Sequence, residues 1–400
     1  MKENYSKKIN SHNLYFLFFC ITFLFTNCQS QKPTSNKKEE QPFTLRFIGE
    51  KTVPFEETLG EGNEKMTVGG LSGIDYDKEN NLYYLLSDDL FDENGRLRFY
   101  TAKIDYTKDE FEKFKILSQN FLKQEDGKLY PTKSEGMKTA DPESIRLSSK
   151  SNTLFWTSEG DRNRNIIPFI AEIDTNGNQI RKITLPKNLI DTSKNKGWYH
   201  NAAIEALAFS ENQEKIWFLS ETPLQQDGEM TKKTEGVFPI RLTCLDIESS
   251  EIEKEFVYLA EPVAKEPIPN TAFGINGIVE ILEWKTEKNN IQFLVLERSY
   301  SQGHKAGSNV VKLFLAETQN ATDSKNIESL KKLVPNKDYI PLKKTLIANL
   351  SEQNLGYIDN IEGMSFGQTL KNGNKTIIFV SDNNFQAIQK TQFLVFEIME

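Results

Sequence analysis

Acidic residues recur along this chain in pairs, and each pair is carried by two consecutive predicted strands. The first member lies near the start of one strand, and the second ends the next strand. The two positions are 16 residues apart in the first three pairs, and 21 and 20 residues apart in the last two. The five pairs are Ser72 and Asp88, Glu143 and Glu159, Glu205 and Glu221, Asn276 and Glu297, and Glu362 and Asp382. Carboxylates repeated in this way can bind a cation, transfer protons or hold the fold together.

These pairs mark a structural repeat, because each of them opens a unit of about four predicted strands. The fifth unit ends after three strands, but a spare predicted strand at residues 43–49 precedes the first unit. Pairing this N-terminal strand with the last unit closes a ring and removes the open sheet edges. The sequence therefore predicts an all-β fold: a single β-propeller of four-stranded blades, closed in this way, over residues 43–400. The alternative is a β-sandwich with a chance similarity between its strands.

The number of blades follows from the number of repeats, which predicts five. Successive units are 62 to 86 residues apart, whereas a compact blade takes about 40 to 50 residues. A sixth blade is therefore the alternative. With five blades, the excess residues are expected in long loops, mainly at 124–140, 222–237 and 317–341.

The first members of the pairs are candidates for a metal site. In a propeller the first strand of each blade lines the central channel, so these side chains should converge at one mouth of it. Carboxylates that meet near one axis repel one another unless a cation binds or some take up protons. Oxygen ligands favour calcium, and only two histidines follow residue 27, which argues against a His-rich zinc site. The predicted calcium ligands are Glu143, Glu205, Asn276 and Glu362, and Ser72 breaks the acidic pattern. Alternatively, these side chains accept hydrogen bonds from neighbouring blades.

The second members are expected one layer further from the axis, where Asp and Glu at strand ends often form turns. Arg162 and Arg298 lie next to such acids and are candidates to clamp a phosphate or carboxylate group; a structural ion pair is the alternative. His200 stands just before the first strand of the third unit and is a candidate acid or base. The alternative is a surface or packing histidine. A Gly-x-Ser-x-Gly elbow is absent from the sequence, so a serine hydrolase is poorly supported.

The N-terminal residues have the pattern of an export signal. Three lysines precede a 12-residue apolar run at positions 14–25, which is too short to span a bilayer. The following Thr26-Asn27-Cys28 resembles the end of a bacterial lipoprotein signal. We therefore expect a signal peptide at 1–27, a lipidated Cys28 and a flexible tether through residue 42. This predicts a lipid-anchored protein of the bacterial cell envelope that faces the periplasm or the outside; plain secretion is the alternative.

Charge and cysteine content restrict the partners. Without residues 1–27, Lys and Arg fall from 49 to 46 and Asp and Glu from 57 to 56, so the net charge is −10. This charge argues against a nucleic acid partner. Cys244 is the one cysteine after Cys28, so no disulfide is expected. A monomer is expected.

At its repeats the chain resembles the phytase-like domain family, also called esterase-like activity of phytase. The carrying motifs cover roughly residues 65 to 390 and include Gly69-Gly70-Leu71-Ser72-Gly73-Ile74, Leu86-Ser87-Asp88-Asp89, Asp141-Pro142-Glu143-Ser144-Ile145, Ile204-Glu205-Ala206-Leu207 and Asn360-Ile361-Glu362-Gly363. The resemblance implies hydrolysis of phosphate esters or carboxylic esters. Propeller lactonases, which hold one calcium ion by Glu, Asn and Asp side chains, offer a further analogy for the predicted ligand set.

Two hypotheses for function follow from this resemblance. In the first, the protein is a calcium-dependent phosphoesterase, esterase or lactonase acting on a small-molecule ester. Glu159 or His200 would then be the base, and Arg162 or Arg298 would stabilise developing negative charge. In the second, it is a non-catalytic surface propeller that binds a ligand or a protein partner.

Overall fold

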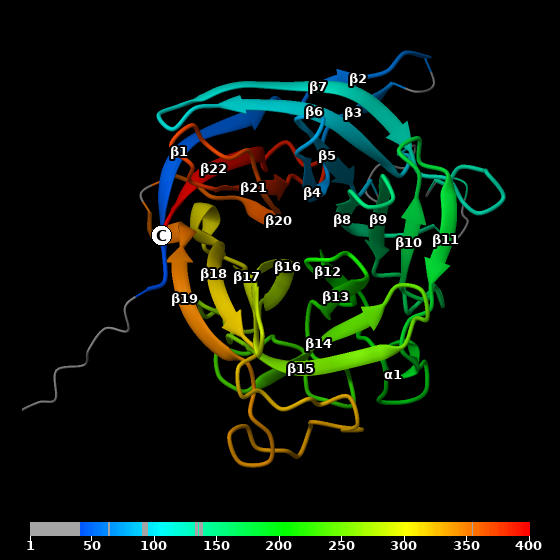
Figure 1. Cartoon of the computed structure of the whole chain (residues 1–400), viewed down its shortest axis with the longest axis vertical. Coiled ribbons are helices and arrows are strands. Elements are labelled where there is room, and N and C mark those ends of the chain that lie inside the picture. Colours follow the sequence, from blue (N-terminus) through cyan, green and yellow to red (C-terminus); the bar gives the residue numbers. More distant parts are fainter. Residues whose placement is uncertain (1–40, 63–64, 90–94, 133–134, 136–138, 354) are drawn as a thin grey trace, which may run out of the picture. The chain divides into compact units, whose positions relative to one another are not determined.

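The computed structural model describes residues 41–62, 65–89, 95–132, 135, 139–353 and 355–400. The predicted signal peptide, the lipidated Cys28 and residues 29–40 of the tether lie outside the described residues and stay predictions. Residues 41–400 form one unit, in which five antiparallel sheets surround a common centre (Figure 1). The described residues contain no helix that is long and apolar enough to cross a membrane.

Each blade consists of four strands, numbered outward from the centre of the ring except where the chain closes it. Blade one contains β4 (Leu71–Asp77), β5 (Leu82–Ser87), β6 (Arg98–Tyr106) and β7 (Phe111–Phe121). Blade two contains β8 (Pro142–Ser148), β9 (Thr153–Ser158), β10 (Phe169–Ile173) and β11 (Gln179–Ile183). Blade three contains β12 (Ile204–Phe209), β13 (Lys215–Ser220), β14 (Phe238–Asp246) and β15 (Ile252–Ala260).

Blade four contains β16 (Gly274–Glu287), β17 (Asn290–Ser301), β18 (Asn309–Glu317) and β19 (Lys343–Asn349). Blade five contains β20 (Asn360–Phe366), β21 (Thr376–Asp382), β22 (Thr391–Met399) and β1 (Thr44–Val53). The minor elements are a β2–β3 hairpin (Thr58–Leu59 and Met66–Thr67), helix α1 (Lys187–Ile190) and the 3-10 turns η3 (Lys305–Gly307) and η4 (Leu350–Glu352).

The ring closes as the sequence predicts. Strand β1 pairs antiparallel with β22, from Thr44 opposite Met399 to Val53 opposite Thr391. The prediction of five four-stranded blades is confirmed. In the described parts of the three long segments, no strand of a sixth blade is present.

Burial changes from the inner to the outer strands of a blade. In blade five, every residue of β21 is buried, because both faces of an inner strand pack against neighbouring blades. In blade one, the outermost strand β7 contains only exposed and half-buried residues, since one of its faces meets solvent. Burial in these two blades therefore decreases from the inner to the outermost strand.

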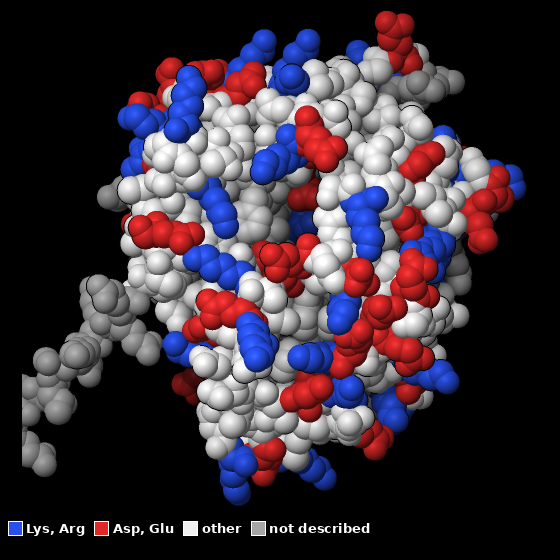
Figure 2. Space-filling model, in the orientation of Figure 1, with Lys and Arg blue, Asp and Glu red and all other residues white. Residues whose placement is uncertain are grey.

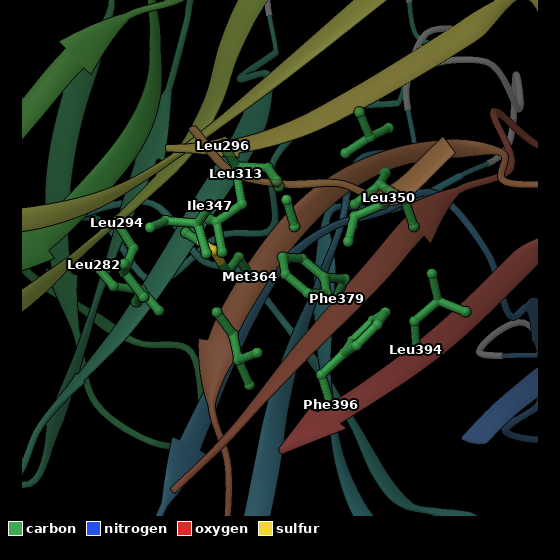
Figure 3. Close-up of a cluster of buried hydrophobic side chains, with 14 of the residues drawn as sticks. Leu282, Leu294, Leu296, Leu313, Ile347, Leu350, Met364, Phe379, Leu394 and Phe396 are labelled. Atoms are coloured by element: carbon green, nitrogen blue, oxygen red, sulfur yellow. The ribbon is translucent and has the colours of Figure 1, made fainter. Parts of the chain in front are cut away.

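Five hydrophobic clusters lie between adjacent blades, and a smaller sixth cluster packs Leu330 and Tyr339 of the long segment against Val257 of β15. Figure 3 shows the cluster between blades four and five, where Leu294 and Leu313 face Met364, Phe379 and Phe396. Because each blade supplies half of two clusters, no blade can bury its apolar faces alone.

An ion pair inside the ring connects all five inner strands. Arg146 on β8 and Glu280 on β16 are almost fully buried and 2.8 Å apart between Nη2 and Oε2. The guanidinium also donates to the carbonyl groups of Ile74 on β4 and Met364 on β20, at 2.8 and 3.2 Å. Glu280 accepts from the backbone amide of Leu207 on β12 at 3.3 Å. We call Arg146 and Glu280 the central ion pair.

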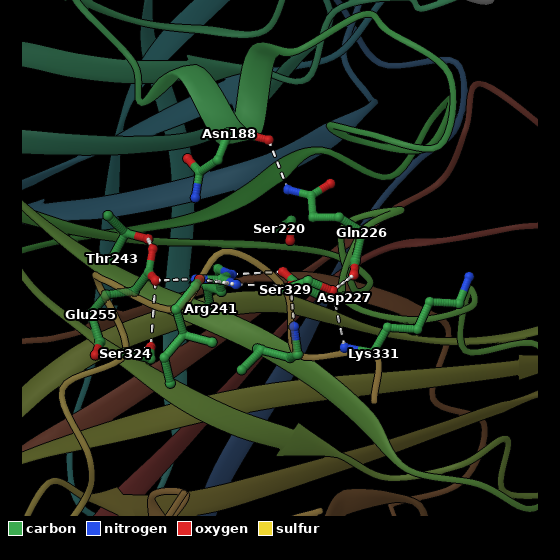
Figure 4. A network of polar contacts seen from close by, with 12 residues as sticks. Asn188, Ser220, Gln226, Asp227, Arg241, Thr243, Glu255, Ser324, Ser329 and Lys331 are labelled. Carbon is green, nitrogen blue, oxygen red and sulfur yellow. Dashed lines mark hydrogen bonds and ion pairs between the residues drawn. The ribbon is translucent and has the colours of Figure 1, made fainter. Parts of the chain in front are cut away.

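The two long segments around blade three are held by a second buried ion pair (Figure 4). Arg241 on β14 donates to Asp227 in the segment at residues 222–237, with a distance of 2.6 Å between Nε and Oδ2. It also donates to the carbonyl of Ile327 in the segment at residues 317–341, at 2.9 Å. Asp227 in turn accepts from the amide of Leu330 at 2.9 Å. These contacts anchor both loops to the blade.

Replacing Asp227 by Asn is expected to loosen the loop at residues 319–342. The Asn side chain keeps one acceptor but loses its charge beside Arg241, which should cost about 1–3 kcal/mol. We expect faster cleavage within 319–342, measured by limited proteolysis and mass spectrometry. Asp338→Asn, an exposed change in the same loop, is the control. Equal cleavage rates for the two variants would contradict the anchoring role of Asp227.

Candidate functional site

β-bulges place the first members of the acidic pairs. In four blades the register between the first two strands shifts at the marked residue, which leaves that residue without a regular partner. The residues in these bulges are Ser72, Glu143, Glu205 and Glu362. A bulge bends the strand and changes the direction of a side chain. The repeat in the sequence thus corresponds to a repeated bulge in the fold.

Blade four departs from this arrangement. Asn276 pairs regularly with Ser299, and the register shift comes later, between Ile278 and Glu280. The side-chain Nδ2 of Asn276 donates to Glu297 Oε2 at 2.8 Å and to the carbonyl of Glu261 at 2.8 Å. Glu297 also accepts from Tyr258 and Lys344, both at 2.6 Å. The pair of blade four is therefore part of a structural network, and the role of Asn276 as a metal ligand stays a prediction.

The other acids form two adjacent groups that share one residue. In each group, one carboxylate oxygen from each residue lies within 4.8 Å of the others. The first group is Glu143, Glu159 and Glu205, and the second is Asp88, Asp141 and Glu143. We call them the Glu159 group and the Asp141 group. Three of these five residues, Asp88, Glu159 and Asp141, were not among the predicted ligands.

The expected outer layer of second-strand acids is not what the structure shows. Asp88 and Glu159 lie in the same groups as Glu143, because the second strand of a blade runs antiparallel to the first. Its end therefore lies beside the start of the first strand, as the pairing of Ser87 with Leu71 shows. Asp141 directly precedes β8 in the motif Asp-Pro-Glu, and that position is the sequence signal that could have identified it.

Several of these carboxylates have no hydrogen-bond donor. The side chains of Glu143 and Glu205 are 9% and 8% exposed and accept no hydrogen bond from the described residues. Asp88 Oδ1 is also buried and has no hydrogen-bond partner among the described residues. Glu159 accepts from the amide of Ala203 at 3.1 Å. Buried carboxylates without donors are costly, so the site favours a cation or protons.

Arg298 provides positive charge on one side of the groups. Its Nη2 lies 3.1 Å from Glu362 Oε1 and 3.8 Å from Glu221 Oε1. Glu362 also accepts from Asn360 at 2.9 Å. A Cβ atom at Gly277 would lie 2.4 Å from Glu221 Oε1, so the glycine at this position makes room for that carboxylate. Arg298 thus compensates Glu362 and Glu221.

Burial shifts the protonation of the whole site. Burial raises the pKa of Glu159 to about 8, and the charge of Glu221 adds to the shift. Burial also raises the pKa of Glu221 to about 7, against the opposing effect of Arg298. The pKa values of five more carboxyl groups lie well above their ordinary range. Burial is the largest cause, and repulsion between neighbouring carboxylates adds to it. The five residues are Asp88, Asp141, Glu143, Glu205 and Asp382.

These shifts predict that, without divalent cations, stability falls as the pH rises. The pKa of Glu221 and Glu159 rises from an ordinary 4.5 to about 7 and about 8 in the folded protein. Between the unfolded and folded values the folded state binds more protons, so the free energy of unfolding decreases with pH. We expect the melting temperature in EDTA to fall by roughly 5–10 °C from about pH 5 to about pH 8. Calorimetry measures this fall; a melting temperature that rises over this range would contradict it.

A cavity of about 950 Å³ adjoins the acids, and Glu221, Arg298 and Glu362 form part of its wall. The rest of the wall includes His200, Lys232, Phe273, Tyr300, Tyr357 and Asp359. Figure 2 shows that the centre of the ring is hollowed on the face in view and that charged side chains surround the hollow. Lys232 and Phe273 come from loops between strands, where neither carries a repeat signal, so sequence reasoning missed them.

The remaining candidates lie near the rim. His200 lines the cavity, and its side chain is 45% exposed, with Nδ1 3.5 Å from Asp161 Oδ1. Arg162 donates to the carbonyl of Trp198 at 3.0 Å and stacks over the Trp198 ring. It also donates to the carbonyl of Ser193 at 3.2 Å. Arg162 thus supports the loop that leads to His200, and its catalytic role stays a prediction.

Comparisons with known proteins give one family and several distant folds. None of the curated proteins matches the chain. Among solved structures, a thermostable family-43 glycoside hydrolase is 9% identical, with 83% of this chain and 89% of that chain covered and a TM-score of 0.40. The Dos1 propeller is 8% identical, with 82% and 68% covered and a TM-score of 0.34. The C-terminal WD40 domain of Sif2 is 11% identical, with 89% and 99% covered and a TM-score of 0.33. Similarities at this level carry no argument about activity.

The family comparison covers most of the propeller. The model of the phytase-like family, described as esterase-like activity of phytase, matches residues 66–385. This range contains both carboxylate groups and Arg298. The chain therefore belongs to the phytase-like family.

Proposed function

We propose that this protein is a metal-assisted hydrolase of phosphate esters or carboxylic esters. The observation that carries the proposal is the Glu159 group, in which the buried carboxylates of Glu143 and Glu205 have no donor among the described residues. Glu221 and Arg298, whose charges act on Glu205, form part of the wall of an open cavity. Membership of a family described by its esterase-like activity supports the same conclusion.

The residues of the site fit a hard divalent cation. Both groups offer carboxylate oxygens and neither contains His or Cys, which suits calcium better than zinc. Glu143 and Glu205 would hold the ion, and Glu159 lies beside them. When bound, such an ion polarises an ester oxygen and lowers the pKa of a coordinated water.

The protein's own groups supply the rest of the chemistry. Glu159 is fixed by the amide of Ala203 and can accept a proton from water once it is ionised. Arg298 lines the cavity, so its guanidinium can stabilise developing negative charge there. His200 at the rim, with Asp161 beside Nδ1, can exchange protons with solvent.

The location of this activity is also a proposal. We place the protein in the bacterial cell envelope, anchored through a lipid on Cys28 and facing the periplasm or the outside. The support is the apolar run at residues 14–25 followed by Cys28 and a polar segment. Palmitate labelling of cells that express wild-type protein or Cys28→Ala tests it. Label that stays on the Cys28→Ala protein contradicts the anchor.

An activity screen tests the proposed hydrolysis. The purified protein is assayed against p-nitrophenyl phosphate, p-nitrophenyl acetate, a lactone and phytate, with calcium and with EDTA. We expect calcium-dependent hydrolysis of at least one class, lost in EDTA. Activity on none of the four with calcium present would contradict the proposal and favour a propeller that binds a ligand or partner without catalysis.

A further inference from the structure

The Asp141 group lies beside the proposed metal site, and two of its members, Asp88 and Asp141, have no part in the chemistry above. It joins blade one to blade two, since Asp88 follows β5, the second strand of blade one, and Asp141 precedes β8, the first strand of blade two. Its third member, Glu143, belongs to both groups. The two groups are therefore two halves of one larger arrangement of oxygen ligands, with Glu143 between them.

The backbone of the Asp141 group is fixed, and two of its three carboxylates lack a donor; the third, that of Asp141, shares a hydrogen bond with Glu159. The amide of Asp88 donates to the carbonyl of Gly70 at 2.7 Å, and the amide of Glu159 donates to the carbonyl of Asp141 at 3.0 Å. The amide of Asp141 donates to Ser158 Oγ at 3.0 Å. In contrast, Asp88 Oδ1 and the nine-tenths buried Glu143 side chain have no donor among the described residues. The group is thus positioned in advance and lacks a positive partner.

When all five carboxylates of the two groups are ionised, their charge exceeds what one divalent cation can compensate. The two groups contain five carboxylates, which carry five negative charges when ionised. One divalent cation leaves three of these charges and two divalent cations leave one. Arg298 cannot make up the difference, because its guanidinium is placed against Glu362 and Glu221.

We propose that the Asp141 group binds a second divalent cation, with the Glu143 carboxylate bridging the two ions. Carboxylate-bridged pairs of ions lie about 3.5–4 Å apart in proteins and bind the two oxygens of an in-line displacement. The inference rests on the cation of the proposed function, but it requires no hydrolysis. Its test is therefore the number of bound ions.

Calorimetric titration of the full-length chain in detergent with Ca²⁺ alone measures this number. We expect two ions per chain for the wild type and one for Asp141→Asn. Asp141→Asn removes one like charge, so its melting temperature in EDTA should be no lower than that of the wild type, which shows that the variant folds. With Mn²⁺, the wild type should give an exchange-coupled EPR spectrum and Asp141→Asn the six-line spectrum of an isolated ion.

Glu221→Gln is the matched control, because Glu221 is a buried carboxylate of the same site outside both groups. It should keep two ions. A single ion in the wild type, or two ions in Asp141→Asn, would overturn the second site. No bound ion in the wild type would overturn the cation of the proposed function as well, so the two failures are distinguishable.

Discussion

Replacing Arg146 by Met should lower the free energy of unfolding by about 3–5 kcal/mol. The change leaves Glu280 as an unpaired buried charge, with its side chain fully enclosed. It also removes the donor to the carbonyl groups of Ile74, Ile145, Ile281 and Met364. These carbonyls belong to four different inner strands, so the loss of their donor weakens the contacts between blades around the ring.

Urea denaturation followed by fluorescence measures this effect. Arg164→Met is the control, since Arg164 is half-exposed and its pairing with Asp161 lies at the surface; it should cost less than about 1 kcal/mol. The double variant Arg146→Met with Glu280→Leu should lose less than the sum of the two single changes, because no charge is then left unpaired. If Arg146→Met were as stable as Arg164→Met, the central ion pair would not hold the ring together.

Replacing Glu143 by Gln should reduce hydrolysis by about 100- to 1000-fold, since a cation contributes several kcal/mol to the transition state. Glu143 is the residue that both carboxylate groups share, so its loss weakens both proposed cation sites. The rise in melting temperature on addition of calcium should disappear. In EDTA, however, the variant should melt higher than the wild type, because one of several repelling buried carboxylates is removed.

Differential scanning calorimetry with and without calcium, together with the ester assay, measures these effects. The control is Glu214→Gln, an exposed glutamate of blade three outside both groups, which should keep the calcium-dependent rise and the activity. A Glu143→Gln protein that retained both the rise and the hydrolysis would refute the assignment of Glu143. An EDTA melting temperature far below that of the wild type would show instead that Glu143 supports the fold.

The ring itself was predictable because its signals are local. The second strand of each blade carries an apolar run that ends in Asp or Glu or directly before one, or, in blade four, contains one, so that each blade can be recognised along the chain. The spare strand at Thr44–Val53 and the missing fourth strand of the last unit predicted the closure that β1 and β22 make. The repeated acidic pairs correctly indicated five blades, and Glu143 and Glu205 from these pairs lie together in the Glu159 group; their role as metal ligands stays a prediction.

The make-up of the site was only partly predictable. Asn276 has the same sequence context as the acids of the other blades, yet the bulge of blade four lies three residues later, around Val279. A bulge is set by how a strand packs against its neighbours, and shifting it by one residue turns the side chains to other directions. The sequence shows the repeat but not the register, so it could not separate Asn276 from Glu143.

The sequence by itself determined the family, the all-β propeller, its five blades and its closure, because strand pattern and repeat length are properties of short segments. Only the tertiary structure decided that Asp88, Asp141 and Glu159 meet Glu143 and that Arg146 and Glu280 join the five inner strands. Asp88 comes from blade one and Glu280 from blade four, whereas the other residues belong to blade two, so these contacts depend on how the blades pack around the axis. No spacing along the chain encodes that packing.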